Sequence, residues 1–133
     1  MCVVTEMVSS RLPESLHAAA LARAFAQSHL CQEHGRDAEP AVMLLTSELV
    51  THALLHGAPP VVVTLECEVW QIRIAVEDAR VDDRDAAPMP GDLSLTLIQK
   101  ISRTWGREAG ESGERFWCTV PTGIVPRRER LSI

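Results

Sequence analysis

The chain has 133 residues, of which 46% are hydrophobic and 23% are charged, as in an ordinary globular protein. This length suffices for one domain with its own hydrophobic core. The formal net charge is −5, and the basic run from Arg127 to Arg130 stands near the end of the sequence. Because duplex DNA is bound through a positive face that displaces counterions, we expect no direct nucleic-acid partner.

Targeting signals and cysteine motifs are not evident in the sequence. Its apolar runs are far shorter than the roughly 20 residues of a membrane-spanning helix, and the first ten residues are too polar for a secretory signal. The four cysteines, Cys2, Cys31, Cys67 and Cys118, form no C-x-x-C pair, which argues against a zinc knuckle or a redox motif. We therefore expect a cytoplasmic protein with buried thiols and no membrane partner.

The first half of the sequence predicts an edge strand and two helices. Residues 2–8 have the composition of a short strand. Pro13 is expected in the first turn of a helix over the alanine-rich stretch ESLHAAALARAFAQSHL, with Gly35 as its stop signal. The second helix is expected from Glu39 to His56, because Gly57 and two prolines follow it.

The second predicted helix has an apolar side with a polar border. At 100° per residue, one arc holds Val42, Leu45, Leu49 and Ala53. Glu48 and His52 lie at the border of that arc, and His56 follows at the next step of four, which stacks side chains on one helix face. This face predicts a metal site, an acid/base pair, or simply the polar edge of a core helix.

The second half predicts a hairpin, a long loop, a helix and a strand. VVVTLECEVWQIRIAVED alternates like two strands with one apolar face each, as in a sheet covered by helices on one side. Residues 79–92 predict a long acidic loop, either solvated or acting as a lid. LSLTLIQKISRTWG is expected as a helix with Trp105 on its apolar face, GREAGESGE as a turn, and RFWCTVP as the last strand. Trp105 and Trp117 are expected in the core.

The stretch LLTSELVTHALLHG resembles the N box of the GHKL ATPase superfamily, which includes gyrase, histidine kinases and anti-sigma factor kinases. It is most similar to the small anti-sigma factor serine kinases of the RsbW and SpoIIAB type, especially the actinobacterial branch, where the stretch usually reads SELVTNA…H. VEDA, LSLTLIQKISRTWG and FWCTVP fall where members of that family have their equivalents. The resemblance covers about residues 11–122, so the remainder from 123 to 133 is a C-terminal tail of a single domain.

The resemblance implies an α+β fold, a two-layer α/β sandwich of the Bergerat type. A mixed, mostly antiparallel sheet would be covered on one face by about three helices. It also implies site residues. Glu48 takes the position of the catalytic base or water-positioning residue near the γ-phosphate. His52 takes the position of the asparagine that ligates Mg²⁺, and Asp78 that of the aspartate that binds the adenine amino group.

Several of these positions depart from the family pattern. His52 offers a nitrogen where Mg²⁺ prefers oxygen. The adenine loop, D-x-G in many members, reads Asp78-Ala79-Arg80, and the phosphate loop has Asp92 and Ser94 where the family has glycines. A carboxylate beside phosphates repels them by kilocalories in a partly closed site. Binding of ATP and Mg²⁺ is therefore expected to be weakened or lost.

The sequence thus predicts a regulatory protein that binds a sigma factor or an anti-anti-sigma protein of the STAS type. An active Mg-ATP-dependent serine kinase that phosphorylates an anti-anti-sigma protein is the first alternative, because Glu48 and Asp78 are retained. A metal-binding module that uses Glu48, His52 and His56 is the second. By the same analogy, a homodimer through the sheet edge or the first helix remains open.

Overall fold

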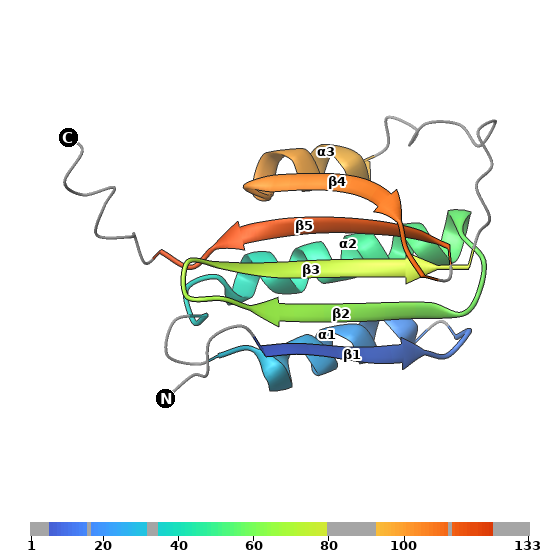
Figure 1. The fold of residues 1–133 in the computed structure, drawn as a ribbon, viewed down its shortest axis with the longest axis horizontal. Helices are drawn as coiled ribbons and strands as arrows, with labels where there is room; N and C mark the ends of the chain where they lie inside the picture. The colour runs from blue at the N-terminus through green and yellow to red at the C-terminus, as the bar shows by residue number, and fades with distance from the viewer. Residues whose placement is uncertain (1–5, 16, 32–34, 80–92, 112, 124–133) are drawn as a thin grey trace.

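The computed structural model describes residues 6–15, 17–31, 35–79, 93–111 and 113–123. Eight elements follow one another along the chain (Figure 1). They are β1 (Glu6–Leu12), α1 (Ala18–His29), α2 (Glu39–His56), β2 (Val61–Cys67), β3 (Gln71–Asp78), α3 (Leu93–Ile101), β4 (Thr104–Ala109) and β5 (Glu114–Pro121). No helix within this described part is both long and apolar enough to cross a membrane.

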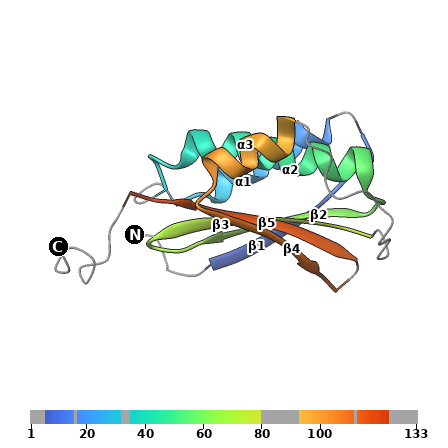
Figure 2. The same ribbon diagram turned by 90° about the horizontal axis from the view of Figure 1, so that it is seen from above.

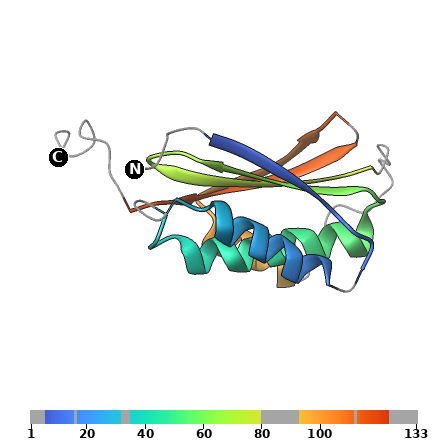
Figure 3. The same ribbon diagram turned by 90° about the horizontal axis from the view of Figure 1, so that it is seen from below.

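The strands form one five-stranded sheet in the order β1-β2-β3-β5-β4. All four described pairings are antiparallel. The three described helices lie together on one face of this sheet, and no described helix lies on the other face, the uncovered face (Figures 2 and 3). The predicted fold class, an α+β two-layer sandwich with helices on one face, is confirmed, but the sheet was expected to be mixed and its described pairings are all antiparallel.

The core lies between the helices and the covered face of the sheet. Strand residues at every second position point toward the helices, as the pleat requires. In β2 and β3 these include Val63, Leu65, Ile72 and Ile74, each with at most 1% of its surface exposed. From α2 the predicted apolar arc of Val42, Leu45, Leu49 and Ala53 packs against them. The interpretation of this helix as core-facing is therefore correct.

The helix and hairpin boundaries were predicted with mixed success. The second helix spans Glu39–His56, as expected, and the hairpin strands are present. The edge strand was expected at 2–8, but its described part runs on to Leu12, because its whole length pairs with β2. The first helix begins at Ala18 and not near Pro13. Ser15 instead forms a turn, accepting the His17 N–H at 3.0 Å through its hydroxyl.

The prediction for residues 102–109 was wrong. The third helix ends at Ile101, whereas it had been expected to continue through Trp105 to Gly106. Thr104–Ala109 instead form a strand, β4, where the end of that helix and the start of a turn had been expected. The Arg103 N–H donates to the Thr119 carbonyl at 2.7 Å, so the chain enters the sheet directly after the helix. Trp105 is 37% exposed, on the edge strand and not in the core, and Trp117 is half-buried.

Three of the four cysteines lie within the described residues. Cys67 and Cys118 are buried on the covered face, and Cys31 is half-buried after α1. Cys2 lies outside the described residues. Burial raises the pKa of the Cys118 thiol to about 12, although the positive charge of Arg73 acts in the opposite direction. This thiol therefore stays protonated and inert at neutral pH.

Candidate functional site

Helix α2 carries two of the predicted site residues along its border toward β5. Glu48 is half-buried, and His52, one helical turn later, is only 8% exposed. Their neighbours Leu49 and Ala53 are buried in the core, so the helix cannot rotate without exposing apolar surface. The packing of α2 therefore fixes the direction in which both polar side chains leave the helix.

The imidazole of His52 packs within a row of rings. Its centroid lies 4.9 Å from that of His56 and 5.9 Å from that of Phe116, which it meets edge-on. Phe116 in turn lies 5.9 Å from Trp105, so the row runs from α2 across β5 to the edge strand β4. Such spacings are typical of attractive aromatic pairs. The ring of His52 is thus packed against the rings of both His56 and Phe116.

Asp78 ends β3 and is 8% exposed. The backbone N–H of Ala58 lies 3.5 Å from its Oδ1, and the Ala79 N–H donates to the Ala58 carbonyl at 2.8 Å. Gly57 leaves room for the carboxylate, since a Cβ there would lie 2.5 Å from Oδ2. The glycine that ends α2 therefore also allows the helix terminus to close against Asp78.

Three predicted site residues are thus placed with their side chains, and for three the side chain is not described. Val76, two residues before Asp78, pairs in register with Phe116, which touches His52, so Asp78 and His52 lie toward the same end of the sheet. Ser94 lies in the first turn of α3, where only its backbone is described. Arg80, Asp92 and the acidic loop with its predicted role as a lid fall outside the described residues.

Phe116 and Ala58 were missed by the analysis of the sequence. Phe116 carried a signal, because in the stretch RFWCTVP it alternates with Cys118 and Val120 on one face of a strand. Its contact with His52 nevertheless depends on the register between β5 and β3, which the local pattern does not contain. Ala58 carried no signal, because it contributes a backbone N–H and carbonyl only.

The donor atoms of this region suit a magnesium ion poorly. His52 supplies an imidazole nitrogen, whereas Mg²⁺ demands oxygen ligands in near-octahedral geometry. In the part of the chain that the structure describes, no group of three or more His, Cys, Asp or Glu side chains is placed to hold a metal ion. The hypothesis of a zinc-binding face made by Glu48, His52 and His56 gains no support from this arrangement.

An apolar groove opens beside the same end of α2, on the side of α1. It has a volume of about 550 Å³ and is walled by the β1–α1 connection and the last two turns of α2. Leu54 and Leu55 lie at this groove and are 37% and 72% exposed. Large exposed apolar side chains around a groove are typical of surfaces that bind another molecule.

A scan against protein-family models finds no match to this chain, and a search of curated proteins finds none either.

Proposed function

We propose that this chain is a regulatory protein of the anti-sigma-factor type that acts in the cytoplasm by binding a protein partner. The partner would be a sigma factor or an anti-anti-sigma protein of the STAS type, and ATP binding would be weakened or lost. The observation that carries the proposal is the packing of His52. The nearly buried imidazole of His52 packs between His56 and Phe116. By the resemblance to the GHKL superfamily, its position is the one that needs an exposed amide oxygen for Mg²⁺.

The exposed groove beside α2 supports a role in protein binding. A fold alone does not determine function, but its surfaces can be kept for binding after its chemistry has been lost. Leu55, 72% exposed at the groove, exposes more of its surface than the other large apolar side chains of the described residues. Burying such a side chain in a complex would contribute roughly 1.5 to 3 kcal/mol.

The test is capture of a partner by the purified chain in buffer without nucleotide. Each sigma factor and each anti-anti-sigma protein of the host is presented separately, and the affinity of any complex is measured by calorimetry. We expect at least one stable complex without ATP. If none of these proteins binds, the proposed function is wrong.

Two substitutions on α2 locate the binding surface. Leu55→Glu places a charge at the groove, and we expect it to weaken the complex by more than about tenfold. Leu44→Glu is the matched control, because Leu44 is on the same helix, 38% exposed and outside the groove. Equal losses from both variants would show that the groove has no special part in binding.

An active serine kinase is the second candidate, because two of its chemical groups are retained. Glu48 and Asp78 are carboxylates at the positions of the base and the adenine-binding residue, and Asp78 is nearly buried, as a specificity residue at the bottom of a pocket would be. Calorimetry with Mg-ATP at millimolar concentration distinguishes this candidate. If ATP binds, Glu48→Ala should abolish phosphotransfer and leave the affinity largely intact.

A further inference from the structure

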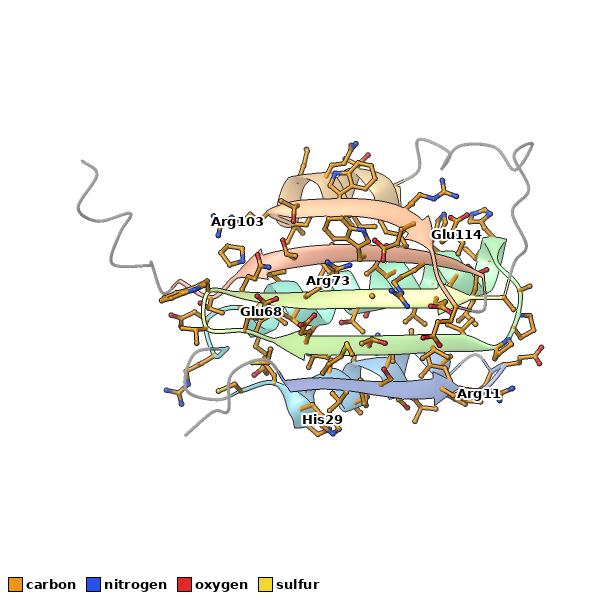
Figure 4. All side chains as sticks on the ribbon, in the orientation of Figure 1. Arg11, His29, Glu68, Arg73, Arg103 and Glu114 are labelled. Carbon is orange, nitrogen blue, oxygen red and sulfur yellow. The ribbon has the colours of Figure 1, made fainter. Side chains whose placement is uncertain are left out.

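The uncovered face of the sheet contains a hollow that the proposed function does not use. It has a volume of about 460 Å³ and is lined by side chains of β1, β2, β3, β5 and the turn that follows β4. Figure 4 looks onto this face, with Arg73 labelled across the middle strands. Its lining residues Val62, Thr64 and Glu66 alternate along β2 with the buried residues that face the helices, so the hollow lies on the opposite face of the sheet from the helices.

Arg115, one of two arginines in this hollow, is engaged by carboxylates of the same chain. Its Nη2 lies 3.0 Å from Oε1 of Glu77, and its Nε donates to the same oxygen at 3.2 Å. Its Nη1 donates to Oε2 of Glu108 at 3.2 Å. The charge of Arg115 is therefore already balanced within the sheet.

Arg73, the other arginine, is held by an aromatic ring. Its guanidinium carbon lies 4.5 Å from the ring centroid of Trp117, and its Nη2 lies 3.8 Å from Oε2 of Glu108. The indole itself lies over Gly106, where a Cβ would come within 2.8 Å of it. Gly106 thus leaves room for the indole of Trp117, and the indole holds the guanidinium of Arg73 over its ring.

Two glutamates of the hollow are left without a cation. Among the described residues, neither Glu66 nor Glu111 has a hydrogen bond or an ion pair. Glu66 faces Arg73 in the register of β2 and β3, but that guanidinium is occupied by Trp117. Glu66 is also half-buried, which strengthens its attraction for an incoming positive charge relative to a fully solvated carboxylate.

The hollow also offers apolar surface between its charges. Met7 is 66% exposed at its edge, and Val62 and Ala75 contribute to its lining. A ligand with positive charges alone would leave this surface in water. The occupant that fits best therefore combines basic and aliphatic side chains.

We propose that the uncovered sheet face docks a basic segment of a partner protein, with one cationic side chain beside Glu66 and a second toward Glu111. The proposal rests on the proposed function in that the segment belongs to the protein that the chain regulates. Glu66 pairs in register with Arg73 of β3. Glu77, which lies near Glu111, is four residues further along β3 than Arg73. At about 3.3 Å per residue, an extended segment would bring its basic residues into these places roughly four positions apart.

The direct test uses the acetylated, amidated peptide Arg-Ser-Leu-Ser-Arg, labelled with a fluorophore and titrated with the full chain. In an extended peptide the two arginines and the leucine project from one side. We expect saturable binding that weakens with salt. The scrambled peptide Leu-Ser-Arg-Arg-Ser has the same charge, and equal binding of both peptides would overturn the proposal.

Two pairs of nearly isosteric substitutions control for general attraction to a chain of negative net charge. Glu66→Gln with Glu111→Gln should weaken binding of the peptide about fivefold. Glu39→Gln with Asp37→Asn removes the same charge at positions outside both the hollow and the groove and should change affinity less than about twofold. Equal weakening by both pairs would overturn the proposal. The proposal would also be overturned if a second copy of the chain occupied the hollow. This would be seen as a dimer that dissociates when Glu66→Gln and Glu111→Gln are introduced.

The same variants separate this proposal from the proposed function. Loss of the captured partner by Glu66→Gln with Glu111→Gln supports docking on the sheet face. A partner that is captured with undiminished affinity overturns the docking proposal and leaves the proposed function standing. If no sigma factor or anti-anti-sigma protein is captured at all, the proposed function fails, and peptide binding by the hollow is judged by the titrations alone.

Discussion

The two faces of the sheet use opposite means of stabilisation. On the covered face, aliphatic side chains such as Ile74 and Leu65 are removed from water by α1 and α2. On the uncovered face, Arg115, Glu77 and Glu108 form ion pairs at the surface, and Arg73 lies on Trp117. Burial of an aliphatic side chain contributes about 1.5 to 3 kcal/mol, whereas an exposed ion pair contributes about 0 to 1.

This difference shows on which face a polar residue indicates a structural or functional role. On the covered side a polar group is costly, so His52, Asp78 and Thr46 need a structural or functional reason to be there. On the uncovered side charges are inexpensive and can vary with little effect on folding. That face can therefore be adapted to a partner, and the informative groups there are the carboxylates that have no ion pair among the described residues.

The largest effect is expected from Ile74→Ala on the covered face. Ile74 is fully buried in the middle strand β3, so the substitution leaves a cavity and should reduce the free energy of unfolding by about 3 kcal/mol. Urea denaturation of the purified variant measures the change. A loss below about 1 kcal/mol would mean that the covered face is not the packed core described here.

Alkaline pH provides the next largest effect, through Cys118. Burial raises the pKa of this thiol from 9.0 to about 12. The unfolded chain releases the proton near pH 9 while the folded chain retains it, so the free energy of unfolding falls as pH rises from there. Over roughly the first 1.5 pH units, this thiol should account for about 2 kcal/mol of that fall.

The measurement for this thiol compares the wild type with Cys118→Val across the alkaline range. The variant changes packing at every pH, but it should have a shallower decline above pH 9 than the wild type. Identical pH dependence in the two proteins would contradict the burial of this thiol.

A smaller effect, of opposite sign, is expected at Thr46. Its side-chain oxygen is buried and has no hydrogen-bond partner among the described residues. Thr46→Val keeps the shape and removes the unsatisfied group, so it should raise the free energy of unfolding by about 1 kcal/mol. Thr64→Val is the control, because the Thr64 hydroxyl has a partner, the Ser9 hydroxyl at 2.8 Å, and its removal should bring no gain in stability. A destabilised Thr46→Val variant would indicate that this hydroxyl has a partner in solution.

The smallest effect is expected from Arg73→Gln on the uncovered face. The substitution removes the contact with Trp117 and the ion pair with Glu108, which together should cost about 1 kcal/mol or less. Because Arg73 adjoins Ile74 on the same strand, the two variants compare the faces at one place in the sheet. A loss as large as that of Ile74→Ala would remove the distinction between the faces.

Local signals explain why α2 was predicted well. Pro40 stands within its first two residues and Gly57 with two prolines follows it, so both ends of the helix are marked in the sequence. The arc of Val42, Leu45, Leu49 and Ala53 could be traced at 100° per residue, although Val50 is buried outside it. Glu48 and His52 could therefore be placed at its border before any tertiary contact was known.

Strand β4 shows what the local signals lack. The residues of β4 alternate neither in polarity nor clearly in burial, because the strand lies at the edge of the sheet. Its strand geometry comes from pairing with β5, in which Trp105 faces Cys118. The same tertiary register brings Phe116 to His52, which is why the row of rings could not be predicted from spacing.

The dependence of partner binding on nucleotide tests the central claim most directly. The affinity of the chain for its captured sigma factor or anti-anti-sigma protein is measured with and without millimolar Mg-ATP. We predict the same dissociation constant in both conditions, because His52 supplies no oxygen ligand for Mg²⁺ and its ring is packed on Phe116. A complex that forms only with Mg-ATP, or phosphorylation of the partner, would contradict this account.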